Sequence, residues 1–301
     1  MPEDHPSHAL GSAPLGNGSS PKPEPLLECI SAGVKVIDLS REMFAGMPQS
    51  PNHPEFRMAL QRRHGDMVRA DGSSAANELI VTGGHVGTHV DALCHVSYKG
   101  RLHNDLDAAQ VQAGGKFSAL GIETMAPVLC RGVLLDIPAV LGISCCPPGY
   151  EITPDDLEAA SCVPGAAPSR GCAILVRSGW GQHFSDRERY IGKQSGVPGP
   201  SESGARWLAE HSPVVVGADT IAFERLAPGA GHAVLPAHRV LLVKEGIHII
   251  EMMDLEELSK TAVVEFVLIL APLKLQGATG SPVRPLAVVS APSDQSQGGS
   301  I

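Results

Sequence analysis

GVLLD at residues 132–136 is followed by TPDDLEAA at 153–160, CAILVR at 172–177 and VVVG at 214–217. Three of these are short apolar runs bounded by Gly or Pro, which is typical of buried strands. The segment at 153–160 begins as a helix does, with Thr as N-cap, Pro at the first helical position and acidic residues in the first turn. Strands that alternate with helices predict an α/β fold, in which helices pack on a sheet.

The same two patterns continue on both sides of this stretch. Further buried strands are predicted at 34–39, 78–81, 247–250 and 266–270, and further helices at 203–211 and 236–245. The segment 139–170 is punctuated by Gly and Pro, which indicates an excursion over the surface. We therefore expect one α/β domain over residues 29–290.

The two ends of the chain differ from this middle part in composition. Residues 1–28 are rich in Pro, Ser and Gly, and residues 291–301 are polar, so neither segment can bury enough apolar surface to offset its chain entropy. We predict a disordered tail over 1–28 and a frayed tail over 291–301. The longest apolar stretch, near 263–273, is too short to span a bilayer, so we expect no membrane partner.

Charge and cysteine content narrow the class of partner. The formal net charge of -9 argues against nucleic acid, because phosphate binding needs a basic face, and a small-molecule substrate is favoured instead. The seven cysteines are an odd number without C-x-x-C spacing, which indicates neither a disulfide framework nor a structural zinc knot. Reduced thiols predict a cytoplasmic protein.

Four side chains that can bind a metal or move a proton fall within the segment HVGTHVDALCH at 85–95. They are His85, His89, Asp91 and His95, a density that 13 histidines placed at random in 301 residues would seldom produce. Imidazole with carboxylate suits Zn²⁺, Mn²⁺ or Fe²⁺, and three ligands from this segment would leave positions open for water and substrate. The alternative, histidines that cap turns and hydrogen-bond within a core, suits a lone histidine better than a cluster.

Glycines at 83, 84 and 87 allow tight turns after the strand predicted at 78–81. Residues that do not share a helix face can therefore converge, and we expect the site to lie where this strand ends. His95 is the best candidate for a general acid or base, because a histidine ordinarily titrates near neutral pH and this one lies farthest along the segment.

A second set of candidates lies outside this segment. Glu251 ends an apolar strand, where a carboxylate must be solvated, paired or metal-bound, and His238 precedes it on a predicted helix. Each is a candidate ligand that completes the first metal site or forms a second one. The alternatives are a surface histidine for His238 and a salt-bridged carboxylate for Glu251. Arg177, Ser178 and Trp180 follow another strand and are candidates for substrate contacts, with a core position as the alternative for the Trp.

The segment 85–95 resembles the motif of the cyclase-like metal-dependent hydrolases, a family that includes kynurenine formamidase and isatin hydrolase. Other blocks that match in the same order, between about 34 and 289, are IDLS at 37–40, GMP at 46–48, ILVRSGW at 174–180, GADT at 217–220, the interval 238–251 and GATGSPVR at 277–284. The resemblance implies a swivelling β/β/α type of fold, here a single domain with a mixed sheet, and a homodimer or homotetramer.

The resemblance also implies the site and its chemistry. It makes His85, His89 and Asp91 the ligands of a Zn²⁺ or Mn²⁺ ion, His238 and Glu251 the ligands of a second ion in two-metal members, and His95 the acid or base. Family members open amide bonds in small N-acyl or cyclic amide substrates, which are C–N bonds other than peptide bonds. The interval from His238 to Glu251 is one residue longer than expected, with the addition within 243–246.

The leading hypothesis is hydrolysis of a small amide, imide or lactam by a metal-activated water. An Fe²⁺ oxygenase is the first alternative, because His89, Asp91 and a remote His238 match a two-histidine, one-carboxylate triad, but this leaves His85 and His95 without a task. A polyketide-type cyclase or dehydratase and a metal-binding protein without turnover are the others. Consumption of O₂ would distinguish the oxygenase.

Overall fold

The computed structural model describes residues 25–291, in which strands and helices alternate as predicted. The strands are β1 (Val34–Asp38), β2 (Arg57–Arg62), β3 (Asn77–Val81), β4 (His89–Asp91), β5 (Gln112–Ala113), β6 (Lys116–Phe117), β7 (Val128–Asp136), β8 (Glu151–Ile152), β9 (Ala173–Arg177), β10 (Gly199–Pro200), β11 (Val215–Ala218), β12 (His248–Glu251), β13 (Glu265–Leu270), β14 (Gly280–Pro282) and β15 (Leu286–Ser290). The α-helices are α1 (Pro25–Ser31), α2 (Ala108–Val111), α3 (Ile137–Leu141), α4 (Pro154–Ser161), α5 (Arg187–Ile191), α6 (Glu202–Glu210), α7 (Pro236–His238) and α8 (Glu256–Lys260). The shorter helical turns are the 3₁₀ segments η1 (His103–Asp105), η2 (Ile122–Thr124) and η3 (Trp180–His183), and η4 (Arg239–Glu245) is a π-helix.

Nine strands form one mixed sheet, in the order β1-β15-β13-β7-β9-β11-β12-β4-β14. The central strands β7, β9, β11 and β12 are parallel, whereas β4 and β14 on one side and β13 and β15 on the other pair in the antiparallel sense. This confirms the predicted α/β class and mixed sheet. All seven predicted strands and all three predicted helices are present.

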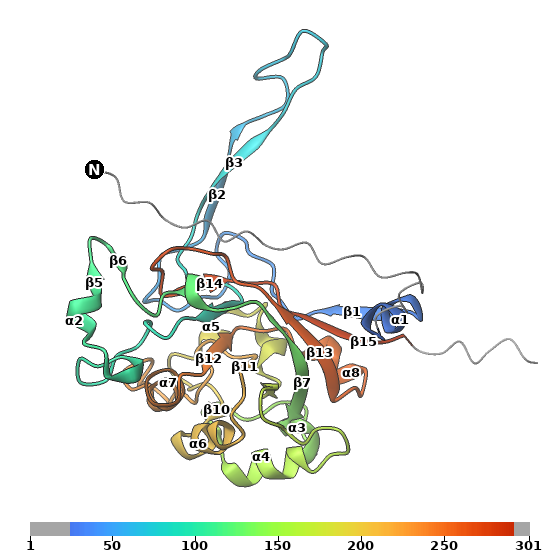
Figure 1. The fold of residues 1–301 in the computed structure, drawn as a ribbon, viewed down its shortest axis with the longest axis vertical. Coiled ribbons are helices and arrows are strands. Elements are labelled where there is room, and N and C mark those ends of the chain that lie inside the picture. The colour runs from blue at the N-terminus through green and yellow to red at the C-terminus, as the bar shows by residue number, and fades with distance from the viewer. Residues whose placement is uncertain (1–24, 292–301) are drawn as a thin grey trace, which may run out of the picture. The chain divides into compact units, whose positions relative to one another are not determined.

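The sheet is buried on both faces at β9 and β11, whereas β13 is buried on one face only. Successive side chains of a strand point to opposite faces, so each face has its own apolar cluster. On β9, Ile174 and Val176 belong to one apolar cluster, and Ala173 and Leu175 belong to another. The first cluster includes apolar side chains of α4, α6 and η4, and Figure 1 shows α4, α6 and α7 together on that side of the strands. β9 and β11 therefore consist almost entirely of apolar residues, as parallel strands covered on both faces do.

The segment 139–170 runs largely over the surface, as expected, but five of its residues are buried in the core. Leu157 and Ala160 on α4 and Ile152 on β8 are buried in the cluster beneath the sheet. The helix begins as predicted, because Thr153 and Asp156 form a reciprocal capping box. The Gly and Pro residues that indicated a loop mark the turns between these short elements.

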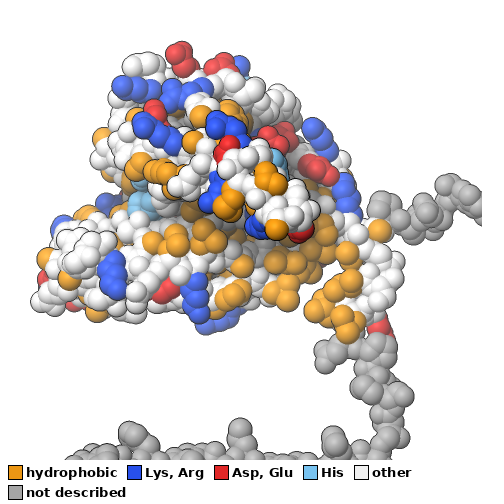
Figure 2. Space-filling view, turned by 90° about the horizontal axis from the view of Figure 1, so that it is seen from above, with side chains coloured by type: hydrophobic (Ala, Val, Ile, Leu, Met, Phe, Trp, Pro, Cys, Tyr) orange, Lys and Arg blue, Asp and Glu red, His pale blue; other side chains and the backbone are white. Residues whose placement is uncertain are grey.

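The strand predicted at 78–81 exists as β3, but it is not buried. It pairs only with β2, and this hairpin extends away from the other strands of its unit (Figure 1). Figure 2 looks along the direction in which the hairpin projects and shows hydrophobic side chains exposed among charged ones on this face. The apolar side chains of β3 are therefore not part of the core of this chain.

The chain divides into a large unit, Lys35–Val289, and a small unit formed by the residues before and after it. Within the small unit, α1 begins at Pro25, so residues 25–28 are helical although the predicted tail included them; Leu26 and Leu27 favour a helix. The rest of the two predicted tails falls on residues 1–24 and 292–301, outside the described residues. Over residues 25–291, no helix is long and apolar enough to cross a membrane.

Candidate functional site

The candidate site is built on β4, which places His89 and Asp91 on the same face of the sheet. The two residues are separated by one position, so both side chains point into the site, and Val90 between them points into the core. The motif begins after the end of β3, as expected, and continues into β4, an interior strand between β12 and β14. Only His85 lies on a turn, which Gly87 makes possible with a φ of +70°.

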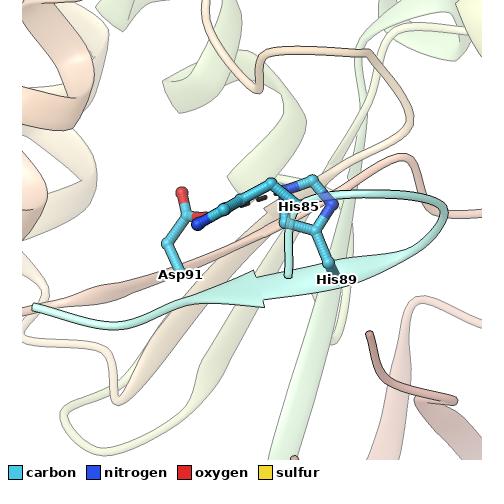
Figure 3. Close-up of side chains that lie close together, drawn as sticks. All are labelled: His85, His89 and Asp91. Carbon is cyan, nitrogen blue, oxygen red and sulfur yellow. Dashed lines mark hydrogen bonds and ion pairs between the residues drawn. The ribbon is translucent and has the colours of Figure 1, made fainter. Parts of the chain in front are cut away.

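The three side chains of the predicted first metal site converge (Figure 3). His85 Nδ1 lies 2.8 Å from Asp91 Oδ1, and His89 Nε2 lies 3.6 Å from the same oxygen. All three residues are buried, and one donor atom from each lies within 4.8 Å of the others. The imidazole of His85 fits against β14 because Gly280 has no side chain; a Cβ there would lie 2.6 Å from His85 Cε1.

His238 and Glu251 join the same cluster from distant parts of the chain. Glu251 ends β12 and lies directly across from His89 in the antiparallel pair of β12 and β4. Its Oε2 lies 3.4 Å from His89 Nε2, and its Oε1 lies 3.0 Å from His238 Nε2. Since His238 Nε2 is also 3.5 Å from Asp91 Oδ2, Asp91 lies between the two halves of the cluster.

The interval between His238 and Glu251, which was expected to be one residue longer than in the family, contains the π-helix η4. A π-helix closes hydrogen bonds between residues five apart, one more than an α-helix, so it fits an additional residue. The helix ends at Gly246, whose φ of +68° reverses the chain into β12.

Two buried carboxylate oxygens in this cluster, Asp91 Oδ2 and Glu251 Oε1, accept no hydrogen bond from any described residue. Burying a carboxylate oxygen without a partner costs several kcal/mol in an apolar environment, so native proteins pair such atoms or bind a cation with them. Both oxygens face imidazole nitrogens at 3.0–3.5 Å. This donor set of nitrogen and oxygen atoms fits a divalent metal such as Zn²⁺ or Mn²⁺.

The electrostatics of the cluster favour its charged forms. Burial alone would raise the pKa of Glu251, but the neighbouring imidazoles of His238 and His89 outweigh it and lower that pKa to about 2. For His238, burial lowers the pKa, but the neighbouring carboxylates of Asp91, Glu224 and Glu251 together raise it well above its usual value. The cluster thus holds carboxylates that attract positive charge.

His95 lies beside the cluster. Its ring stacks on that of His85 with centroids 3.8 Å apart, and burial is the main cause that lowers its pKa to about 3. His95 also has a ring nitrogen within reach of Asp91 and His238 as a possible ligand set. A neutral imidazole at this position has the lone pair that a proton acceptor needs.

A small cavity of ≈ 180 Å³ opens onto these imidazoles. Sequence reasoning missed several of its polar lining residues, among them Asn52, His53 and His232, because they lie on loops with no motif. His53 stacks on His85 with centroids 5.1 Å apart. The buried Gln49 holds this loop in place, since its amide donates to the carbonyl oxygens of His53 and Pro54.

Each imidazole of the cluster is oriented by a partner on its far nitrogen. His85 Nε2 lies 2.9 Å from the hydroxyl of Thr279, and His89 Nδ1 lies 2.8 Å from the carbonyl oxygen of Gly87. His238 Nδ1 lies 2.6 Å from the carboxylate of Glu224. Thr279 belongs to the block GATGSPVR (277–284), to which no role was assigned above. The sequence indicates Glu224 only as a charged residue within the largely apolar stretch TIAFERL (220–226).

The three predicted substrate-binding residues are not brought together with this cavity. Arg177 forms ion pairs with Asp136 and Glu256, and Ser178 donates its hydroxyl to Asp219. Trp180 is buried, and its indole nitrogen donates to the carbonyl oxygen of Tyr190. None of the three lines the cavity. Their ion pairs and hydrogen bonds indicate that they stabilise the structure around the site.

Replacing Trp180 tests this structural role. Trp180→Ala is expected to reduce the free energy of unfolding by about 3–5 kcal/mol, because a large buried side chain leaves a cavity. Trp207→Ala, at a partly buried position, is the matched control and is expected to lose less. Denaturant unfolding measures both. An unchanged stability for Trp180→Ala would argue instead for a role in the cavity.

Comparisons with known proteins agree with this geometry. The model of the cyclase family ("Putative cyclase") matches residues 37–225. An isatin hydrolase from Roseibium aggregatum is 24% identical over 267 residues, which cover 86% of this chain and 94% of that protein. The crystal structure of a novel cyclase superposes with a TM-score of 0.77 and 29% identity, covering 88% of this chain and 93% of its own. Isatin hydrolase A from Labrenzia aggregata shares the fold, with a TM-score of 0.67, 21% identity and coverage of 88% and 98%.

Proposed function

Because the chain belongs to the cyclase family, we propose that it is a metal-dependent hydrolase that opens an amide bond in a small cyclic amide or imide, or in an N-acyl compound. The observation that carries this proposal is the buried cluster with two carboxylate oxygens that no described residue satisfies. The isatin hydrolase relative, matched over 94% of its length, supports a C–N bond other than a peptide bond as the target.

His85, His89 and Asp91 would hold one Zn²⁺ or Mn²⁺ ion, and His238 and Glu251, with Asp91 between, would hold a second. A divalent ion at such a site acts as a Lewis acid and makes water nucleophilic near neutral pH. The chain itself contributes a buried set of side chains around this position. It also holds each imidazole in one orientation through the partners described above.

His95 is the residue that moves the proton. Water adds to the carbonyl carbon, His95 accepts the proton that water loses, and the same proton passes to the nitrogen as the C–N bond breaks. The products are a carboxylic acid and an amine from an amide, or a carboxylic acid and an amide from an imide, and they remain one molecule when the substrate is cyclic. The position of His95 against the cluster and at the cavity supports this role.

The cavity favours a small substrate. Its volume of ≈ 180 Å³ lies below the range of about 300–1,000 Å³ that is usual for drug-sized ligands. Apolar side chains from Val96, Ile221 and Leu235 line it together with the polar residues. A compact ring with one or two carbonyl groups suits such a lining.

The test is metal analysis of protein purified without chelator, followed by a hydrolysis screen. Isatin, N-formylkynurenine, hydantoins and cyclic imides are the substrates to screen, with each ion added back to metal-free protein. We expect bound Zn²⁺ or Mn²⁺ and ring opening of at least one of these compounds without O₂ uptake. Consumption of O₂ with Fe²⁺ would support the oxygenase alternative instead.

We further propose that the chain forms a homo-oligomer through the hairpin of β2 and β3. Five large apolar residues of the hairpin are at least half exposed: Met58, Leu60, Leu79, Ile80 and Val81. A two-stranded hairpin by itself is marginally stable in water, and an exposed apolar surface of this kind is typical of a protein interface. A second copy of the hairpin, with the same apolar side chains, is the partner that fits.

Charges introduced on the hairpin test this assembly. Met58 and Ile80 face each other across the two strands, so Met58→Lys with Ile80→Lys is expected to convert the oligomer to monomers. Light scattering after size-exclusion chromatography measures the mass. Val163→Lys with Val214→Lys, at exposed positions elsewhere, is the matched control. A wild-type monomer, or an unchanged mass in the hairpin variant, would contradict the proposal.

A further inference from the structure

We infer that Glu224 is a positioning residue for the second metal: it keeps the proton of His238 on Nδ1, so that Nε2 is free to bind the ion shared with Glu251. This inference rests on the proposed metal centre and adds to it a residue outside the predicted ligand set.

Glu224 is buried, and both of its oxygens face donors. Oε2 accepts the backbone N–H of Ala237 at 2.9 Å, and Oε1 accepts the backbone N–H of His238 at 3.0 Å. Oε1 also lies 2.6 Å from His238 Nδ1. Because a carboxylate is only an acceptor, Nδ1 must carry the proton, and in the neutral imidazole Nε2 is left with a lone pair.

The free nitrogen points at the unpaired carboxylate oxygens. His238 Nε2 lies 3.0 Å from Glu251 Oε1 and 3.5 Å from Asp91 Oδ2, the two atoms without hydrogen bonds in the described chain. A lone pair that faces two negative oxygens is repelled by them, so this nitrogen carries a proton in the metal-free site and can exchange it for a metal ion. The tautomer that Glu224 selects is therefore the one that a metal ion requires.

Glu224 differs from the partners of the other two imidazoles. His85 and His89 contact a hydroxyl and a carbonyl oxygen, which are neutral, whereas His238 contacts a carboxylate. A carboxylate partner raises the basicity of the ligating nitrogen and thus its affinity for a metal. Glu224 also adds a third buried carboxylate to Asp91 and Glu251, and one divalent ion alone would leave one negative charge uncompensated.

A plain structural role is the competing explanation, since Glu224 also accepts two backbone N–H groups where α7 begins. Such a role would lower the stability of a variant but would not change the affinity of one metal position relative to the other. The experiment must therefore report on each ion and on the tautomer, besides the melting temperature.

The experiment is titration of metal-free protein with Zn²⁺ by calorimetry, in wild type and in Glu224→Gln. Wild type is expected to bind two ions per chain. Glu224→Gln is expected to keep the first affinity and to weaken the second about 10- to 100-fold, because supporting partners of metal-binding histidines have effects of this size. Glu188→Gln, at an exposed position, is the matched control and is expected to match wild type.

NMR of Zn²⁺-loaded wild type labelled with ¹⁵N-histidine gives a second readout, which reports on the tautomer directly. The His238 signal, identified by its loss in His238→Gln, is expected to show the proton on Nδ1 and none on Nε2. A proton on Nε2, or two unchanged affinities in Glu224→Gln, would overturn the inference. A single ion bound outside His238 would also overturn it and leave the hydrolase intact, whereas a wild type that binds no metal would overturn the proposed function itself.

Discussion

Asp91→Asn is expected to abolish both metal binding and hydrolysis, the largest effect of any single change in this chain. Asp91 is the proposed ligand of the first ion that also contacts His238, with Oδ1 toward His85 and Oδ2 toward His238. Loss of a residue that merely supports a metal ligand costs about 10- to 100-fold in affinity. Loss of the shared carboxylate is therefore expected to cost more than about 100-fold, which calorimetric titration with Zn²⁺ or Mn²⁺ measures.

The matched control is Asp105→Asn, because Asp105 is exposed and its positive φ of 58° suits Asn. This variant is expected to bind metal as wild type does. Asp91→Asn must also keep its fold, which circular dichroism checks. Tight binding of two ions by a folded Asp91→Asn protein would contradict the assignment of the site.

His95→Gln is expected to reduce kcat by about 10²- to 10⁴-fold, the usual contribution of a general acid or base, while metal content stays at two ions per chain. Gln is similar in size and polarity but cannot accept and release a proton. Steady-state kinetics on the substrate found in the screen measures the loss. Elemental analysis of the same sample measures the metal.

The metal content decides between two roles for His95. A ring nitrogen of His95 lies close enough to Asp91 and His238 to be a ligand. If His95→Gln loses an ion together with its activity, His95 is a ligand and the proton carrier must be another residue at the cavity. His64→Gln, on the exposed hairpin, is the matched control and is expected to change neither quantity.

Local patterns predicted most of the fold because the signals are strong over short stretches. The apolar run 172–177 and the Thr153 cap each identify an element without knowledge of the rest of the chain. The strand at 78–81 shows the limit of this reasoning. Its apolar residues were assigned to the core of the chain, but they are exposed on a hairpin, and a pattern of side chains does not say which surface will cover them.

The site was predictable where its residues are close in sequence, and much less so elsewhere. The spacing of His85, His89 and Asp91 indicated a metal ligand set, and the chain brings the three together. Glu224 and His53 could not be found in this way, because each reaches the site through a loop whose path depends on packing. Arg177, Ser178 and Trp180 were predicted to contact the substrate because they lie at the end of a strand. Their polar atoms bond instead to other residues of the chain.

We propose that a divalent ion binds among His85, His89 and Asp91. The most direct measurement is an anomalous difference map from crystals of the Zn²⁺-loaded protein, recorded on both sides of the zinc absorption edge. We predict a peak within bonding distance of one atom from each of the three side chains, present only above the edge. A map without a peak at this position, in a crystal that binds zinc elsewhere or not at all, would contradict the claim.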